Sequence, residues 1–585
     1  MLHPLSVEYH AVRINLPFQA LLLALAVTGL TPPCPGQYPG GAWEQVAIDH
    51  SALPRSYGAY LASGYEIDGD GFDDYAVYFL YSWSSNDSFG SVELHSGRDT
   101  SFLWDFQGPS NLFGSSVPTN LHIIGDLNGD SIPEVLVGWP DASPDTPTYD
   151  NRGAVCILSG ADGSLIESLL GQPSGVLVGE EFGSGVAPLN DVDFDGFPDF
   201  AVGARSSTPD WNHNRFGRVG VYSGQTRQLL WEKRGDSYGV FLGERVANAG
   251  DFNRDGVDDV LVSVPHYPTG NTNRPGRVEI LSGSNGQLLQ FYERVTDGSD
   301  FGEVMQCLGD VDGDQVPDHV IAMPLDSYQG RAACGAAFLY SGASGSVLWS
   351  EFGARMEDNF GFAVARLPDL DWDGVNDVAI SAIHARNGQG VGKAGIVKIL
   401  SGASGNQIWR LRGTKYGGGF GRSLATGKNP KGDNPISLYV GEPTYDNLGR
   451  VHKYDFNTFL QASEKTLSAA TGGTVDYQID FPDSEALKKY VLLASASGID
   501  RTPLGSIEIP LRADHLYYRM LSGQAPIYFQ DAFGVLDTNG DATATLDVPA
   551  NTLNAWAGRI LYGVALSYDQ DTRLCSIPYP LKIIP

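Results

Sequence analysis

The chain of 585 residues is poor in cysteine and in basic side chains. Only five cysteines occur, too few for a disulfide scaffold, so we expect buried or free thiols. Lysine and arginine together number 38, against 69 acidic residues, and the formal net charge is −31. A charge of this sign argues against nucleic acid and against anionic membrane surfaces as partners.

Sequence motifs of common enzyme classes are also missing. The chain has no His-Glu-x-x-His, no Gly-x-Ser-x-Gly, no phosphate-binding glycine loop and no Cys-x-x-Cys. The sequence therefore predicts a protein that is not an enzyme. An extracellular hydrolase or lyase acting on polysaccharide stays open as an alternative, because catalytic residues can lie far apart in sequence.

An apolar run occurs near the N-terminus, at Leu16–Leu30. It follows Arg13 and precedes a segment rich in proline, residues 31–37. The run is short for a membrane-spanning helix, which needs about 20 residues. The order of positive charge, apolar core and small residues is typical of a secretion signal. We therefore predict a signal peptide over residues 1–37, a secreted or cell-surface protein and no membrane span after cleavage. A retained anchor is the alternative.

The chain contains 72 glycines. It also contains repeated copies of one acidic loop pattern. The clearest copy is Asp310-Val-Asp-Gly-Asp-Gln-Val-Pro-Asp318, with carboxylates at positions 1, 3, 5 and 9. Calcium takes six to eight oxygen ligands in flexible geometry, and alternate residues of a tight loop can supply them. Val316 at position 7 would add its backbone carbonyl. Four carboxylates this close together repel one another strongly without a cation between them.

This loop pattern recurs about every 60 residues. A period of this length, built of short apolar runs and glycine turns, predicts propeller blades that are four-stranded antiparallel sheets. The six loops begin at Glu66, Asp126, Asp191, Asp251, Asp310 and Asp369.

Each loop is preceded by an aromatic residue and a glycine. In the fourth unit the pair reads Phe241-Leu-Gly243, with one residue inserted. A third predicted strand in each unit ends in Ser-Gly, as in Ile396–Gly402, and a fourth carries a Leu-Trp or Ile-Trp pair in several units. The other pairs are Tyr57-Gly58, Phe113-Gly114, Phe182-Gly183, Phe301-Gly302, Phe360-Gly361 and Phe420-Gly421.

A seventh unit at Phe420–Phe456 has the aromatic–glycine pair but a lysine-bearing loop, so we predict no ion there. Its fourth strand is weak, and Trp43–Ile48 resembles a fourth strand. We therefore expect residues 43–48 to complete the seventh blade and to close a propeller over residues 43–460. Closure removes exposed sheet edges.

The pattern changes from about Leu467, where short alternating runs predict a β-sandwich over residues 467–585. The whole chain is thus expected to be all-β. The seven predicted strands are Thr474–Phe481, Tyr490–Ser495, Ser506–Leu511, Tyr517–Leu521, Ala542–Val548, Ile560–Ser567 and Ile577–Ile584.

With two motifs repeating in phase, the chain resembles FG-GAP repeat proteins and the seven-bladed propeller of integrin α subunits over residues 43–460. The last 119 residues more loosely resemble a β-sandwich appended to secreted bacterial propellers. The resemblance implies cell adhesion or binding of an extracellular protein or glycan. A structural matrix component without a discrete ligand is another alternative.

The resemblance also implies a set of ligands for about six structural Ca²⁺ ions. Each loop would use four side chains and the carbonyl of its seventh residue. The side chains are Glu66, Asp68, Asp70 and Asp74; Asp126, Asn128, Asp130 and Glu134; Asp191, Asp193, Asp195 and Asp199; Asp251, Asn253, Asp255 and Asp259; Asp310, Asp312, Asp314 and Asp318; and Asp369, Asp371, Asp373 and Asp377. The carbonyls belong to Phe72, Ile132, Phe197, Val257, Val316 and Val375.

The partner should bind on the face opposite these loops. In an antiparallel blade, the connections 1–2 and 3–4 lie at one edge, and 2–3 and 4–1 at the other. Exposed aromatic side chains on loops are common anchors for partners. The 2–3 connections carry Trp83, Tyr149, Trp211, His213, His266, Tyr267, Tyr328, His384 and Tyr445.

Overall fold

The structure is a computed structural model. It describes residues 43–48, 54–84, 87–108, 119–143, 151–172, 179–208, 215–267, 276–294, 301–371, 373–387, 391–428, 436–445, 449–456, 459–464, 466–481, 485–498, 502–504, 507–509, 511–569, 572–576 and 578–585. The predicted signal peptide and the pair Phe113-Gly114 lie outside these residues.

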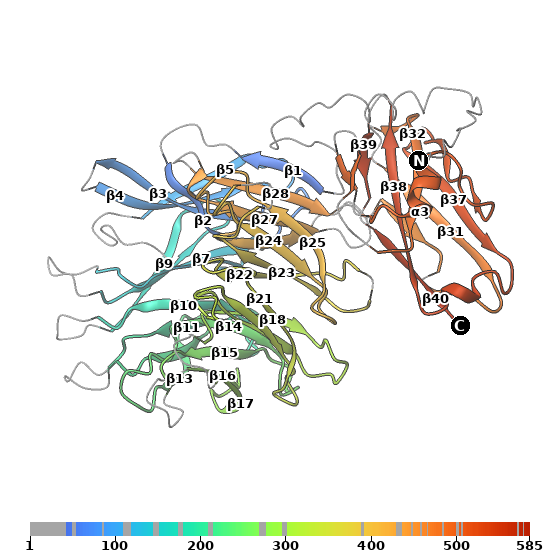
Figure 1. The fold of residues 1–585 in the computed structure, drawn as a ribbon. Coiled ribbons are helices and arrows are strands. Elements are labelled where there is room, and N and C mark those ends of the chain that lie inside the picture. Colours follow the sequence, from blue (N-terminus) through green and yellow to red (C-terminus); the bar gives the residue numbers. More distant parts are fainter. Residues whose placement is uncertain are drawn as a thin grey trace, which may run out of the picture. The chain divides into compact units, whose positions relative to one another are not determined.

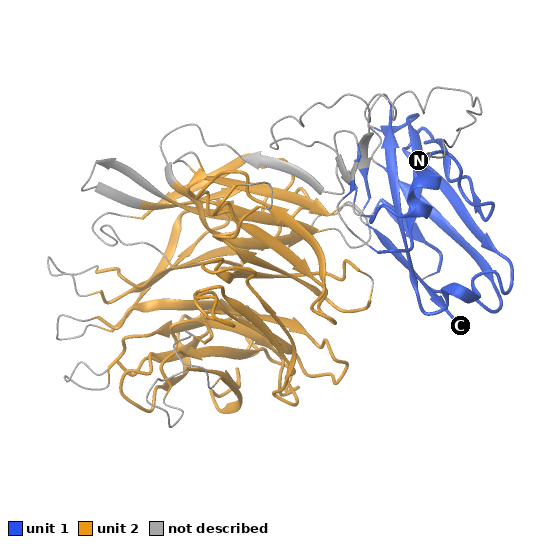
Figure 2. Cartoon of the chain, in the orientation of Figure 1, with its two compact units in different colours: residues 1–41, 459–585 blue, residues 42–458 orange. Residues whose placement is uncertain are grey.

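The described residues form two compact units, one within residues 42–458 and one within residues 459–585 (Figure 2). Nearly all regular structure in both units is β-strand (Figure 1), so the predicted all-β class is confirmed. None of the helices in the described part of the chain is long and apolar enough to cross a bilayer.

The unit within residues 42–458 contains seven four-stranded antiparallel sheets among its described residues. In chain order they are β2 (Pro54–Tyr65), β3 (Asp74–Ser84), β4 (Asp87–His95) and β5 (Phe102–Gln107); β6 (Asn120–Ile124), β7 (Glu134–Trp139), β8 (Ala154–Leu158) and β9 (Leu165–Leu170); β10 (Phe182–Pro188), β11 (Phe200–Ala204), β12 (Arg218–Tyr222) and β13 (Leu229–Arg234); β14 (Val246–Gly250), β15 (Asp259–Val264), β16 (Arg277–Leu281) and β17 (Leu288–Glu293); β18 (Val304–Gly309), β19 (Asp318–Met323), β20 (Ala336–Tyr340) and β21 (Val347–Phe352); β22 (Phe360–Leu367), β23 (Asp377–Ala382), β24 (Ile396–Leu400) and β25 (Gln407–Arg412); and β26 (Leu424–Lys428), β27 (Ile436–Glu442), β28 (Arg450–Phe456) and β1 (Trp43–Ile48).

The sheets follow one another around a ring, as in a β-propeller. The first strand of each sheet contacts the first strand of the next, and β26 contacts β2. In the last sheet the outer strand is β1, which pairs antiparallel with β28 from Trp43–Phe456 to Ile48–Val451. The start and the end of the propeller sequence therefore share one sheet.

Burial within a blade follows strand order. Second and third strands such as β7 and β8 are buried at every residue, because neighbouring blades cover both of their faces. Fourth strands such as β9 are largely exposed. Val, Ile and Leu therefore fill the second and third strands, and this continuous apolar pattern is what the sequence displays.

In several blades the first residue of the aromatic–glycine pair forms a backbone bridge to the preceding blade. Phe182, for example, forms a parallel bridge with Gly153 at the start of the preceding blade's third strand. Gly183 follows with φ of +89°, and a Cβ there would lie 2.7 Å from the Ala154 carbonyl oxygen, so a side chain does not fit.

The expectation of an inserted residue in the fourth unit is wrong. Leu242, not Phe241, makes the equivalent bridge, to Gly217, and is buried. Phe241 instead packs edge-on against His266, with ring centroids 5.0 Å apart. The buried position therefore requires a large apolar side chain rather than an aromatic ring.

In its described residues, the unit within residues 459–585 has two larger sheets and one α-helix. Tyr477 and Tyr579, one from each sheet, meet edge-to-face with centroids 6.5 Å apart, which places them in a shared core. The first sheet is β29 (Leu460–Ala462), β31 (Gly473–Asp480), β37 (Asp541–Val548) and β35 (Phe529–Gln530). The second is β30 (Thr466–Ser468), β40 (Tyr579–Ile584), β38 (Ile560–Tyr568), β32 (Lys489–Ser495) and β36 (Phe533–Val535), with β39 (Thr572–Cys575) beside β38; β33 (Thr502–Leu504) and β34 (Ile507–Ile509) form a separate hairpin.

The predicted strand at Tyr517–Leu521 is wrong. These residues belong to α3 (His515–Leu521), and Asp514 caps it by accepting a hydrogen bond from the Tyr517 backbone N–H. Tyr517, Met520 and Leu521 are the buried residues, at the spacing of one helical face. A short 3₁₀ turn, η3 (Asn554–Trp556), precedes β38.

Candidate metal centres

All six acidic loops connect the first strand of a blade to its second strand. Their ninth residue begins or directly precedes the second strand, where the flanking strands bury it. The ninth residues are Asp74, Glu134, Asp199, Asp259, Asp318 and Asp377, each 0% exposed.

In loop five, the buried Asp318 carboxylate connects two turns of its blade. Its Oδ2 accepts hydrogen bonds from the backbone N–H groups of Val311 (2.7 Å) and Asp312 (3.2 Å). Its Oδ1 accepts one from the Gly342 N–H (2.8 Å) in the turn between β20 and β21. The loop and that turn therefore lie at the same edge of the blade.

The exposed part of loop five is folded around Asp310. Asp310 Oδ1 accepts hydrogen bonds from Gly313 (2.7 Å) and Asp314 (3.0 Å), and Oδ2 accepts one from Gln315 (2.8 Å). Asp314 in turn accepts from the Val316 N–H at 2.8 Å. The backbone donors thus hold several carboxylates in a small volume before any ion is considered.

The bond from the seventh residue's N–H to the fifth residue's carboxylate occurs in all six loops. It fixes the residue whose carbonyl was predicted to bind the ion; ligation by that carbonyl stays a prediction. The donors are Phe72, Ile132, Phe197, Val257, Val316 and Val375, and the acceptors are Asp70, Asp130, Asp195, Asp255, Asp314 and Asp373.

In five loops, three carboxylate oxygens lie within 4.8 Å of one another, close enough to share one cation. Loop four does not form such a group within the described residues, and its position 3 is Asn253. The groups are Glu66, Asp68 and Asp70; Asp126, Asp130 and Glu134; Asp191, Asp193 and Asp199; Asp310, Asp312 and Asp318; and Asp369, Asp371 and Asp377.

Several of these carboxylates lie in surroundings that disfavour their negative charge. Burial raises the pKa of Asp318 to about 6 and that of Asp74 to about 7. In loop six, burial and then the neighbouring Asp371 carboxylate raise the pKa of Asp377 to about 9. Both causes indicate a site that favours a positive charge among its oxygens.

Loop six also leaves one buried acceptor unused. Asp371 Oδ1 is buried and has no hydrogen-bond partner in the described part of the chain. Buried carboxylate oxygens normally have partners, and a hard cation would supply one here. An all-oxygen donor set with an unpaired buried oxygen fits a divalent cation at this loop.

In the six blades with an acidic loop, the Ser-Gly pair that follows the third strand belongs to the same centres, a role that we did not predict. In loop six, Ser401 Oγ donates to Asp373 Oδ2 (3.2 Å), and the Gly402 N–H donates to Asp377 Oδ1 (3.0 Å). The recurrence of Ser-Gly in phase with the loops was the available signal. Because connections 1–2 and 3–4 were expected at the same edge of a blade, this recurrence could have been assigned to the acidic loops from the sequence.

An FG-GAP repeat model matches residues 182–222 and 242–280. Similar curated proteins include integrin alpha-4 of Xenopus laevis, 30% identical over 33% of this chain and 20% of that protein, and integrin alpha-V of Gallus gallus, 27% identical over 36% of this chain and 20% of that protein. A solved structure of BBS1N in complex with ARL6DN aligns with a TM-score of 0.43 and 10% identity, over 71% of this chain and 97% of that one.

The chain spans about a fifth of the length of these integrins. The matched repeats contain loops three and four together with the pairs at Phe182 and Leu242, which the structure shows at the blade junctions. Motif, blade structure and relatives agree: the chain carries FG-GAP repeats in a β-propeller and is similar over part of it to integrin alpha subunits.

Proposed function

We propose that the protein is a secreted, calcium-stabilised β-propeller that binds an extracellular protein or glycan and serves in adhesion at a cell surface. About six Ca²⁺ ions would occupy the acidic loops. Their role is structural, because each loop is tied by hydrogen bonds into its own blade. Likeness to integrin α subunits supports a binding role rather than catalysis.

The partner would bind at the edge of the blades opposite the acidic loops. The observation that carries this proposal is a repeated pairing of a tyrosine ring in a 2–3 connection with the arginine that begins the following strand. The Arg277 guanidinium lies 3.8 Å from the ring centre of Tyr267, and Arg450 lies 3.8 Å from that of Tyr445. Tyr328 stacks on Phe352 at 3.8 Å.

These rings are half-buried, which makes them rigid but still accessible. Tyrosine and arginine side chains held in place lose little entropy when they bind a partner, and both are enriched at binding hot spots. Of the other residues predicted for this surface, His266 is exposed and His384 is half-buried, where its Nδ1 is in hydrogen-bond contact with Asn359. Tyr149, Trp211, His213 and the side chain of Trp83 lie outside the described residues.

The test is capture of cell-surface proteins and a glycan array, with the mature protein in calcium. Changing Tyr267, Tyr328 and Tyr445 together to Ala should abolish capture. Phe194→Ala is the matched control, because Phe194 is an aromatic residue 74% exposed in an acidic loop at the opposite edge. Unchanged capture by the triple variant would refute the assigned face. Turnover of a polysaccharide that survives the triple change would favour the hydrolase or lyase.

A further inference from the structure

The unit within residues 459–585 contains a cavity that the propeller does not explain. Its volume is about 470 Å³, within the range of small-molecule sites. The apolar side chains of Leu546, Leu561 and Ile583 line it, from β37, β38 and β40. Both sheets of the unit thus contribute to its inner wall.

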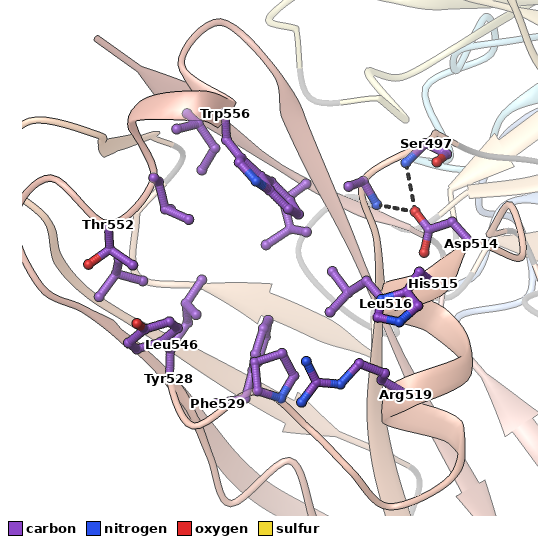
Figure 3. A pocket seen from close by; sticks show the side chains of 16 residues that line it. Ser497, Asp514, His515, Leu516, Arg519, Tyr528, Phe529, Leu546, Thr552 and Trp556 are labelled. Atoms are coloured by element: carbon purple, nitrogen blue, oxygen red, sulfur yellow. Dashed lines mark hydrogen bonds between the residues drawn. The ribbon is translucent and has the colours of Figure 1, made fainter.

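Aromatic side chains line two other sides of the cavity. Trp556 lies in η3, and its ring projects into the cavity from the side opposite α3 (Figure 3). Phe529, in β35, lies below it in the same view. A ligand in this space would therefore contact flat rings as well as aliphatic side chains.

The charged groups at the cavity all come from one short segment, Asp514 to Arg519. The Asp514 carboxylate is already saturated: Oδ2 accepts hydrogen bonds from Ser495 Oγ (3.1 Å), the Ala496 N–H (2.8 Å) and the Ser497 N–H (3.0 Å), and Oδ1 accepts one from the Tyr517 N–H (2.9 Å). It fixes the wall of the cavity and is not available to a ligand.

Arg519 is different. Its guanidinium extends along the cavity toward Phe529 (Figure 3), and within the described residues no carboxylate forms an ion pair with it. A guanidinium beside an apolar cavity is complementary to one anionic group attached to an apolar body. A sugar would need several converging polar groups, and these walls offer few.

We propose that this cavity binds a small amphipathic carboxylate of the fatty-acid class. The carboxylate pairs with Arg519, and the alkyl chain lies between Trp556 and Leu546. Binding would be a second activity of the chain, separate from the propeller face and from the acidic loops.

The experiment is calorimetric titration of the full-length protein, in calcium, with decanoate and with decanol as the uncharged probe. Decanoate should bind, and Arg519→Gln should weaken it about tenfold, the usual effect of losing a charge-assisted hydrogen bond. Decanol should bind both proteins equally. Lys582→Gln is the matched control, because Lys582 is exposed on β40, beside the cavity-lining Ile583 but on the other side of the strand. It should bind decanoate as the unmodified protein does.

A second variant tests the cavity independently, so that the proposal can still be tested if Arg519→Gln does not fold. Thr552→Phe places bulk in the cavity and should abolish binding of both probes while the melting temperature is kept. No decanoate binding to the unmodified protein, or equal binding by Arg519→Gln, would overturn the proposal. Arg519-dependent binding of a peptide with an apolar C-terminal residue, without decanoate binding, would replace the fatty acid by a peptide.

Discussion

At the scale of single residues, the ninth position of an acidic loop differs from the other carboxylate positions because its side chain is buried. Asp318 accepts hydrogen bonds with both oxygens while the first, third and fifth carboxylates remain exposed. The ninth residue therefore supports the fold whether or not an ion is present. An ion bound in the loop would add to this support through the exposed carboxylates.

We predict that Asp318→Asn destabilises the protein by about 2 kcal/mol, both with calcium and with EDTA. The amide keeps one acceptor oxygen but presents an NH₂ to a backbone N–H, so a buried donor loses its partner. Denaturant unfolding measures the change. Asp314→Asn is the control, because its remaining oxygen can still accept from Val316; it should destabilise only when calcium is present. Loss of the Asp318→Asn effect in EDTA would show that the residue acts through the ion alone.

His122 on β6 provides a second residue-scale prediction. Burial lowers the pKa of its imidazole to about 4, although a hydrogen bond to the Val186 backbone partly offsets this. As pH falls from 6.5 to 4, the unfolded chain binds a proton at His122 before the folded protein does, so folding stability is lost over this window. His122→Gln removes this loss.

Relative to the unmodified protein, His122→Gln should therefore gain about 3 kcal/mol in unfolding free energy between pH 7 and pH 4. Urea unfolding at the two pH values gives the difference. Between pH 7 and pH 8 the two proteins should not diverge, because the imidazole is neutral in both states. An equal loss of stability on acidification in both proteins would contradict the assignment.

At the scale of elements, one glycine joins an acidic loop to the neighbouring blade. The Gly402 N–H donates to Asp377, and its carbonyl accepts a hydrogen bond from Trp349 Nε1 (2.7 Å) on β21 of the preceding blade. Trp104 makes the same bond to Gly160 (2.6 Å), and Trp231 makes it to Gly283. The same glycine therefore links the hydrogen bonds of an acidic loop to the contact between two neighbouring blades.

Trp349→Phe should destabilise the protein by about 1 to 2 kcal/mol, because the ring still packs but the Gly402 carbonyl loses its donor. Leu348→Ala on the same strand changes an exposed side chain and should cost about 0.5 kcal/mol or less. Both values come from urea unfolding. Equal effects of the two changes would indicate that packing, not the hydrogen bond, matters at β21.

The elements also show how far sequence reasoning reaches. Loop positions were predictable because carboxylates at every second residue repel one another and seldom recur in phase without a cation between them. The second strands were predictable because burial on both faces gives unbroken apolar runs. We did not predict that Leu242 takes the place of the aromatic residue. The buried position requires a large apolar side chain, which need not be aromatic.

The helix α3 was missed because Tyr517–Leu521 was assigned as one of a series of short alternating runs. Asp514 and the spacing of Tyr517, Met520 and Leu521 nevertheless indicate a capped helix. The cavity beside α3 depends on contacts between distant strands, which no local pattern contains.

At the scale of the whole molecule, acidic loops occur in six of the seven blades, so ion removal should act on these six together. We predict that EDTA lowers the melting temperature by about 10 °C or more and that added calcium restores it. Differential scanning calorimetry measures the shift. Magnesium at the same concentration should restore it less, since it usually retains several waters instead of binding in an all-protein site. A melting temperature unaffected by EDTA would refute structural calcium.

The pairing of β1 with β28 also sets the order of events when the protein is made. Trp43 leaves the ribosome long before Phe456, its partner. Until β28 has been synthesised, β1 has no strand with which to pair. The incomplete propeller then has two open edges that can bind other chains. Ring closure must therefore follow synthesis of the last blade, and this step, with the longest sequence separation in the unit, is where assembly is slowest and most exposed to misfolding.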